Sequence, residues 1–340
     1  MKRNFRARKL ASEDKIMSRT ILFALIAAAT VWAPSALLDK ASSSHSRLQV
    51  ANKTLLERLG YPPGAKLLIV HADDLGMARS INAATIKAFE TGLVSSGSIM
   101  VPCPWLPEIA AYARTHADAD LGLHLTLTSE WTSYRWGPVL SKDRVASLLD
   151  NSGYFYLTES EAASHANAKE VEAEIRAQID RARSFGIHPT HLDSHMGTLY
   201  QNKTLFETLL RVARENKLPI RMSKEWFAST DYLPSILSPN DVAIDKIVSI
   251  EPTVTAEGWS KFYADSIRNI QPGVTEMIIH LAYDDEEMRA ATADHPDWGA
   301  AWRQRDFQFF TSDTFRKLLQ ENHIKLITWR EIGKMQYPSP

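Results

Sequence analysis

The sequence predicts an α/β fold in which parallel strands form a closed or partly closed barrel. Short apolar segments alternate with segments of helical period along most of the chain. The apolar segments are hydrophobic almost throughout, as expected for parallel strands that helices cover. About seven such units follow one another, which favours a barrel over an open sheet.

The elements follow in order from the apolar pattern. The first strand is expected at 66–71, and the helix after it at 81–90, with Gly92 just past its end. Segment 121–127 alternates, so that its leucines share one face and His124 lies on the other. The other strands are expected at 94–101, 190–194, 218–222, 276–281 and 325–328. The other helices are expected at 106–115, 168–185, 203–215, 259–270, 313–322 and 330–335. Segment 130–153 has few periodic features and is expected to be a long loop.

Composition is that of an ordinary globular protein, but the N-terminus is distinctive. The chain has 340 residues and a net charge of -1, which gives no reason to expect a nucleic acid partner. Basic residues within 2–9 precede an apolar run at 21–33 and small residues after it, the order of a secretory signal. We therefore expect a signal peptide and flexible segment at 1–45, and a single domain at 46–340 that is secreted or periplasmic. An uncleaved membrane anchor is the alternative, although the run is short for spanning a bilayer.

Cys103 is the only cysteine, so an internal disulfide is excluded. It lies between Pro102 and Pro104 with no basic neighbour that would lower its pKa. We expect a buried structural thiol rather than a nucleophile.

Three polar clusters occur where predicted strands end. They are 71–74 (His-Ala-Asp-Asp), His124, and 191–195 (His-Leu-Asp-Ser-His). Taken singly, each also fits an ordinary role, such as a turn aspartate that caps the backbone. Together, one carboxylate and two imidazoles form a ligand set that leaves positions open for water and substrate. A divalent cation held there would activate water, and the second aspartate of the pair could accept its proton, so the sequence predicts a metal-dependent hydrolase.

Five segments also carry a family resemblance in their order and spacing, and a weaker likeness continues at 277–280. The five segments are 67–77, 92–96, 101–104, 121–128 and 189–195. They resemble the YdjC-like carbohydrate deacetylases (the chitooligosaccharide deacetylase family), relatives of the NodB-type polysaccharide deacetylases. The chain departs from the family pattern at 196–200 and 281–282, so the particular sugar is left open.

The resemblance implies a distorted (β/α) barrel and the removal of an N-acetyl group from an amino sugar or oligosaccharide by metal-activated water. It implies one divalent cation, Mg²⁺ or Zn²⁺, bound by Asp74, His124 and His195. It also implies that Asp73 is the general base and that His280 is a candidate acid that protonates the leaving amine. The alternative for His280 is a strand-end histidine hydrogen-bonded to the backbone.

Other functions remain open from the sequence. One is a metallohydrolase that acts on an O-acetyl ester or a phosphoester, and another is an inactive carbohydrate-binding protein. A phosphoesterase would favour Lys or Arg near the metal, and none of the three clusters contains one. Trp131 and Trp136 in the long loop either stack on a sugar ring or fill the core. Segment 284–287 (Asp-Asp-Glu-Glu) fits an exposed acidic helix start or a second cation site. The oligomeric state is not indicated.

Overall fold

The computed structural model describes residues 53–338, and the predicted signal peptide lies outside this range. Among the described residues, no helix combines the length and the apolar character needed to cross a membrane.

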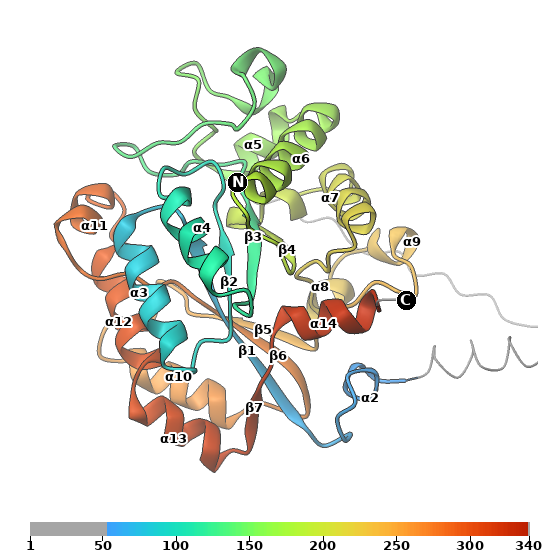
Figure 1. Ribbon diagram of the computed structural model, residues 1–340, viewed down its shortest axis with the longest axis vertical. Coiled ribbons are helices and arrows are strands. Elements are labelled where there is room, and N and C mark those ends of the chain that lie inside the picture. The colour runs from blue at the N-terminus through green and yellow to red at the C-terminus, as the bar shows by residue number, and fades with distance from the viewer. Residues whose placement is uncertain (1–52, 339–340) are drawn as a thin grey trace, which may run out of the picture. The chain divides into compact units, whose positions relative to one another are not determined.

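Seven strands form one parallel sheet in the order β4-β3-β2-β1-β6-β5, and β7 pairs with the start of β1 (Figure 1). Two isolated bridges continue the curl beyond the edge strands. Ile220 bridges Leu192 of β4, and Ser223 bridges Ile244, which lies just before β5. The expected distorted (β/α) barrel is therefore confirmed. The strands are β1 (Lys66–Leu75), β2 (Ser96–Ile99), β3 (Leu121–Leu125), β4 (Leu192–Ser194), β5 (Lys246–Ser249), β6 (Gly273–Ile279) and β7 (Ile324–Leu326).

Helices cover the outer face of the curled sheet (Figure 1). The helices are α2 (Leu55–Arg58), α3 (Arg79–Glu90), α4 (Leu106–Thr115), α5 (Glu159–His165), α6 (Ala168–Ser184), α7 (Lys203–Asn216), α8 (Lys224–Ala228), α9 (Leu233–Ile236), α10 (Trp259–Arg268), α11 (Glu286–Ala291), α12 (Ala300–Phe310), α13 (Asp313–Glu321) and α14 (Trp329–Gln336). In α7, for example, the Asn202 side chain accepts the Leu205 N–H and so begins the helix.

Strand β1 shows how the sheet positions polar groups. Its residues alternate between two faces, as strand geometry requires. Leu68 and Val70 pack in the cluster that contains α3, α10 and α13, whereas Leu67 and Ile69 pack with Trp329. The strand face that carries Leu67 and Ile69 continues toward the C-terminal end of β1 with His71 and Asp73. The apolar interior of the barrel therefore gives way to polar residues at the C-terminal ends of the strands.

Several expectations are tested by these elements. The strand expected at 218–222 is wrong, because only Ile220 makes a bridge there. Strand β5 and helix α12 were not expected. The acidic segment does begin a helix, α11, whose N-cap Asp285 accepts the Met288 N–H. Cys103 is buried, and burial raises the pKa of its thiol well above the ordinary value, as expected for a structural cysteine.

Candidate active site

The three predicted metal ligands converge at one end of the barrel. Asp74 lies near the end of β1, His124 lies in β3, and His195 directly follows β4. One ligand atom from each lies within 4.8 Å of the others. Asp74 Oδ1 is 3.5 Å from His124 Nε2 and 3.5 Å from His195 Nδ1. The structure thus brings together residues that are far apart in the sequence.

A β-bulge explains how Asp73 and Asp74 both reach this site. The pairing of β1 with β2 shifts register between Ala72 and Leu75, and Asp74 has a φ of 72° in the left-handed region. Consecutive residues of a regular strand would point to opposite faces, but a bulge re-aims a side chain. Both aspartates consequently line the same cavity.

The outer nitrogen of each imidazole faces a carboxylate. His124 Nδ1 lies 2.6 Å from Asp193 Oδ1, and His195 Nε2 lies 2.9 Å from Glu130 Oε2. Such partners fix the ring orientation and leave the other nitrogen for a metal. Burial lowers the pKa of His195, but Glu130 and Asp74 outweigh it and raise that pKa to about 10. At pH 7 both ring nitrogens of His195 therefore carry a proton. A cation bound at Nδ1 would displace the proton there.

Asp74 presents an oxygen that is free of hydrogen bonds from any residue between 53 and 338. Its Oδ2 accepts a hydrogen bond from Arg303 Nη2 at 2.8 Å, whereas its buried Oδ1 accepts none within this range. Burial opposes ionisation, but Arg303 and His195 lower the pKa of Asp74, so the carboxylate is charged. Ligand atoms about 2.1 Å from a tetrahedral cation lie about 3.4 Å apart, close to the spacing at Oδ1. The residues present therefore fit a divalent cation.

Asp73 lies beside this ligand group and is held by two basic side chains. Arg221 donates from Nη2 to Asp73 Oδ1 at 2.7 Å and from Nη1 to Oδ2 at 3.2 Å. His71 Nε2 lies 3.1 Å from the same Oδ1, and His124 Nε2 lies 3.7 Å from Oδ2. Burial would raise the pKa of Asp73, but Arg221 above all holds it well below its ordinary value. Asp73 is thus an oriented, ionised carboxylate next to the candidate cation position.

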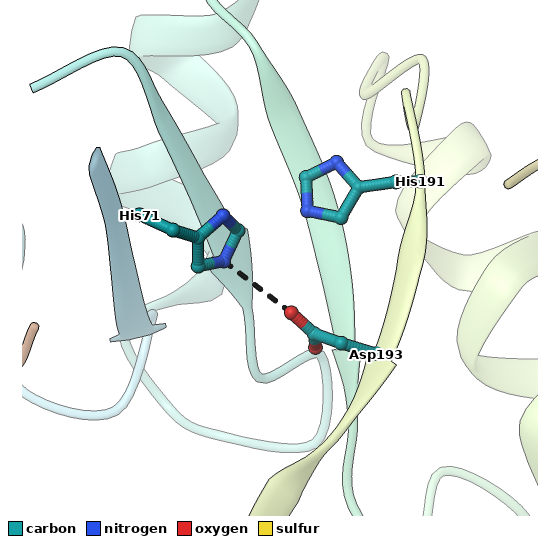
Figure 2. A group of neighbouring side chains, drawn as sticks. All are labelled: His71, His191 and Asp193. Atoms are coloured by element: carbon teal, nitrogen blue, oxygen red, sulfur yellow. Dashed lines mark ion pairs between the residues drawn. The ribbon is translucent and has the colours of Figure 1, made fainter. Parts of the chain in front are cut away.

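A second buried polar layer lies beneath these residues. Figure 2 shows His71 from β1 and Asp193 from β4 pointing toward each other, with His191 beside them. His71 Nε2 is 3.3 Å from Asp193 Oδ2. His191 packs against Gly122, where an added Cβ would lie 2.3 Å from its Nε2.

Arg221 contributes positive charge to this layer. His71 also contributes, because burial lowers its pKa but Asp193 and Asp73 outweigh this and raise the pKa to about 9. The Arg221 guanidinium is 2.7 Å from Asp193 Oδ2 and 3.3 Å from Glu276 Oε1, in addition to its contacts with Asp73. The atoms of His71, His191 and Asp193 are also close enough together to hold a cation, but the Arg221 guanidinium already contacts the Asp193 carboxylate here. Through Asp193 and His71, this layer holds His124 and Asp73 of the site in position.

A cavity of about 470 Å³ opens above the ligand group. His280 lines it, and no side-chain hydrogen bond of this ring is found within the described chain. The His280 backbone N–H donates to Asp306 Oδ2 at 3.0 Å. Burial and Arg303 outweigh Asp74 and lower the pKa of His280 to about 4, so the imidazole is neutral at pH 7.

The cavity wall is largely apolar and aromatic. Trp131, Trp298 and Met196 contribute to it. Trp136 does not belong to the described lining, and its indole N–H donates to Thr128 O at 2.7 Å. Both tryptophans considered from the sequence are almost fully buried in the core, and Trp131 is the one that also borders the cavity.

Three site residues were missed by sequence reasoning, and one premise was wrong. Arg221, Arg303 and Glu130 all line the cavity, so basic residues do lie near the candidate cation position. Arg221 was detectable as a charged residue within an expected apolar strand, and Glu130 as the first charged residue after β3. Arg303 gave no such signal, because its helix was not expected.

Comparison with known proteins identifies the family. The family model described as YdjC-like protein matches residues 67–321, a range that contains all three strand ends and the cavity. The chain belongs to the YdjC-like family.

Relatives of this YdjC-like chain extend over most of its length. A carbohydrate deacetylase of Thermus thermophilus is 32% identical over 284 residues, covering 82% of this chain and 97% of the relative. A carbohydrate deacetylase of Thermoanaerobacter pseudethanolicus is 26% identical, covering 78% and 98% of the two chains. A solved structure of a putative cellobiose-phosphate cleavage protein of Enterococcus faecalis has 27% identity and a TM-score of 0.67, covering 79% and 99%. The carbohydrate deacetylase family assignment thus extends over nearly the whole described fold.

Proposed function

We propose that the protein is a metal-dependent deacetylase that hydrolyses the N-acetyl group of an amino sugar or short oligosaccharide. The observation that carries the proposal is the ligand group: buried Asp74 Oδ1 has no hydrogen-bond partner in the part of the chain that the structure describes, and it faces one ring nitrogen each of His124 and His195. The other nitrogen of each ring faces a carboxylate. The carbohydrate deacetylase relatives support a sugar as substrate.

Asp74, His124 and His195 would hold one divalent cation, Mg²⁺ or Zn²⁺. Such a cation supplies a Lewis acid that polarises the acetamide carbonyl and makes water a better nucleophile at neutral pH. The mixed nitrogen and oxygen ligand set suits Zn²⁺, and the carboxylates around it also tolerate Mg²⁺.

Asp73 is proposed as the general base that accepts a proton from the attacking water. It is ionised, it faces the cavity, and Arg221 holds both of its oxygens in place. A base must lie within reach of the proton that it removes, and the bulge places Asp73 next to the cation ligand. The low pKa set by Arg221 also means that the collected proton is readily passed on.

His280 is proposed to assist protonation of the leaving amine. Its ring lines the cavity without a side-chain hydrogen bond within the described residues. Because its pKa is lowered to about 4, the neutral ring must first receive a proton during the cycle. Asp73, which has accepted a proton from the attacking water, is the proposed source of that proton.

The rival functions are weighed by the same contacts. Both arginines that line the cavity form ion pairs with site carboxylates, Arg221 with Asp73 and Arg303 with Asp74, which leaves less positive charge for a phosphate. Arg303 Nη1 has no hydrogen-bond partner within residues 53–338, so the assay must also include phosphate release. The oriented base Asp73 would be superfluous in a protein that only binds sugar. An O-acetyl ester would use the same groups, so the assay must compare the two kinds of acetyl substrate.

The test combines metal analysis with product analysis. Purified protein is stripped with a chelator, reloaded with Zn²⁺ or Mg²⁺, and assayed for acetate release from N-acetylated and O-acetylated sugars and for phosphate release from sugar phosphates. We expect metal-dependent acetate release from N-acetylated sugars. D73N should bind the metal but lose turnover, and D118N, a matched change at an exposed aspartate, should keep both. Metal-independent turnover, or full activity of D73N, would refute the proposal.

We also propose export of the protein, on the basis of the signal-like N-terminal sequence. N-terminal sequencing of the protein recovered from culture medium and periplasm should show cleavage after the apolar run. An intact N-terminus in the membrane fraction would instead support the anchor.

A further inference from the structure

Arg303 connects two parts of the site with one buried guanidinium group. It lies in α12 and its side chain is 2% exposed. Nη2 donates to Asp74 Oδ2 at 2.8 Å, and Nε donates to the carbonyl oxygen of Trp298 at 2.6 Å. Because the guanidinium is planar and rigid, its two contacts keep a fixed geometry that a lysine ammonium would not provide.

The contact with Asp74 determines which carboxylate oxygen is free. A carboxylate can bind a cation through one oxygen or through both. Here Arg303 occupies Oδ2, while Oδ1 faces His124 and His195. A cation at this position therefore meets a carboxylate that is prepared for coordination by a single oxygen.

The contact with Trp298 fixes part of the cavity wall. Trp298 has a φ of 56°, in a region that bulky residues rarely adopt. Its ring stacks on Trp302 with centroids 4.8 Å apart, and it lines the cavity. Such a conformation persists only where surrounding contacts enforce it, and the Arg303 hydrogen bond to the Trp298 carbonyl is one of these contacts.

We propose that Arg303 is a positioning residue that holds Asp74 to one-oxygen metal coordination and fixes Trp298 as a wall of the substrate cavity. The proposal rests on the metal-dependent function proposed above. Its two contacts serve different steps, since Asp74 belongs to the cation and Trp298 faces the substrate. Loss of the contact with Asp74 would alter the coordination of the cation, and loss of the contact with Trp298 would alter substrate binding.

The experiment compares R303M, R303K and the control R305M. Arg305 lies in the same helix but over the Trp259 ring, 5.0 Å from its centroid, and is outside the described cavity lining. Each variant is titrated with Co²⁺ alone, and the visible absorption spectrum reports the coordination number without reference to activity. The kcat and KM for acetate release are then measured with the N-acetylated sugar that the wild-type protein hydrolyses fastest.

R303M frees Asp74 Oδ2, so its Co²⁺ spectrum should shift toward that of a higher coordination number, and kcat should fall about 10–100-fold. R303K keeps a positive charge beside Asp74 but loses the hydrogen bond that Arg303 Nε donates to the Trp298 carbonyl. It should show a spectrum near that of wild type and a KM raised severalfold. R305M should change none of these values.

A wild-type spectrum for R303M, or an unchanged KM for R303K, would overturn the proposal. If R303M does not fold, R303K decides alone: a wild-type spectrum with raised KM supports the proposal, and any other pair of results refutes it. Wild-type protein that fails to bind Co²⁺ or to release acetate refutes the proposed function itself, and this inference with it. An active wild-type protein with unaltered Arg303 variants refutes only this inference.

Discussion

Glu130 is expected to set the metal affinity through His195, although it does not belong to the ligand group. Its Oε2 lies 2.9 Å from His195 Nε2, and its side chain is only 12% exposed. Because Nε2 donates to Glu130, Nδ1, 3.5 Å from Asp74 Oδ1, is the nitrogen that would bind the metal once its proton is displaced. Loss of a carboxylate behind a ligating histidine typically costs about 10–100-fold in affinity, or about 1.4–2.7 kcal/mol.

We therefore expect E130A to bind Zn²⁺ about 10–100-fold more weakly than wild type, measured by competition with a chromophoric chelator. E130Q keeps an acceptor oxygen and should lose less. The matched control is E159A, because Glu159 also lines the cavity but is not within hydrogen-bond distance of His195. Equal affinities of E130A and E159A would show that the Glu130 contact does not orient the ligand.

Three further predictions concern the surroundings of the site. G122A should lower the free energy of unfolding in urea by about 1–3 kcal/mol, because its Cβ would meet His191 Nε2, and the double variant with H191A should recover part of the loss. Burial raises the pKa of Asp306 to about 7 in the folded protein, so the unfolded state releases this proton first as pH rises. The stability of wild type relative to D306N should consequently fall between about pH 4 and 7, by up to about 1.4 kcal/mol per pH unit, and a pH-independent difference would contradict this. Cys103 should react with a thiol reagent only after denaturation, and rapid reaction of the native protein would show that the thiol is accessible.

The sequence was informative wherever a strand ends in polar residues. The bulge residues Asp73 and Asp74, His124 and His195 follow apolar segments, and parallel strands deliver such ends to one rim. Short-range pattern and one topological rule were therefore sufficient to bring these four residues together. Their chemical roles remain predictions, since only the arrangement is seen.

The parts that sequence reasoning missed depend on long-range contacts. Helix α12 buries Arg303 and Asp306 together with Trp302 and Phe309, so its inner face carries charges and lacks a clean apolar stripe. Those polar groups are explained by distant partners. Arg303 contacts Asp74 in β1, and Asp306 accepts from the His280 backbone and from two side chains of α10, Trp259 and Tyr263. For segment 218–222 the error was the opposite one, since a strand was expected there and is not formed. The segment is apolar enough for a strand, but only Ile220 bridges to β4.

The bulge in β1 restricts how this site can change. Aspartate and asparagine tolerate left-handed backbone far better than longer or branched residues do. Replacing Asp74 by glutamate would thus strain the main chain as well as displace the oxygen donor. Any retuning of metal preference on this scaffold is expected to occur at the two imidazoles and the acids behind them, while position 74 stays an aspartate.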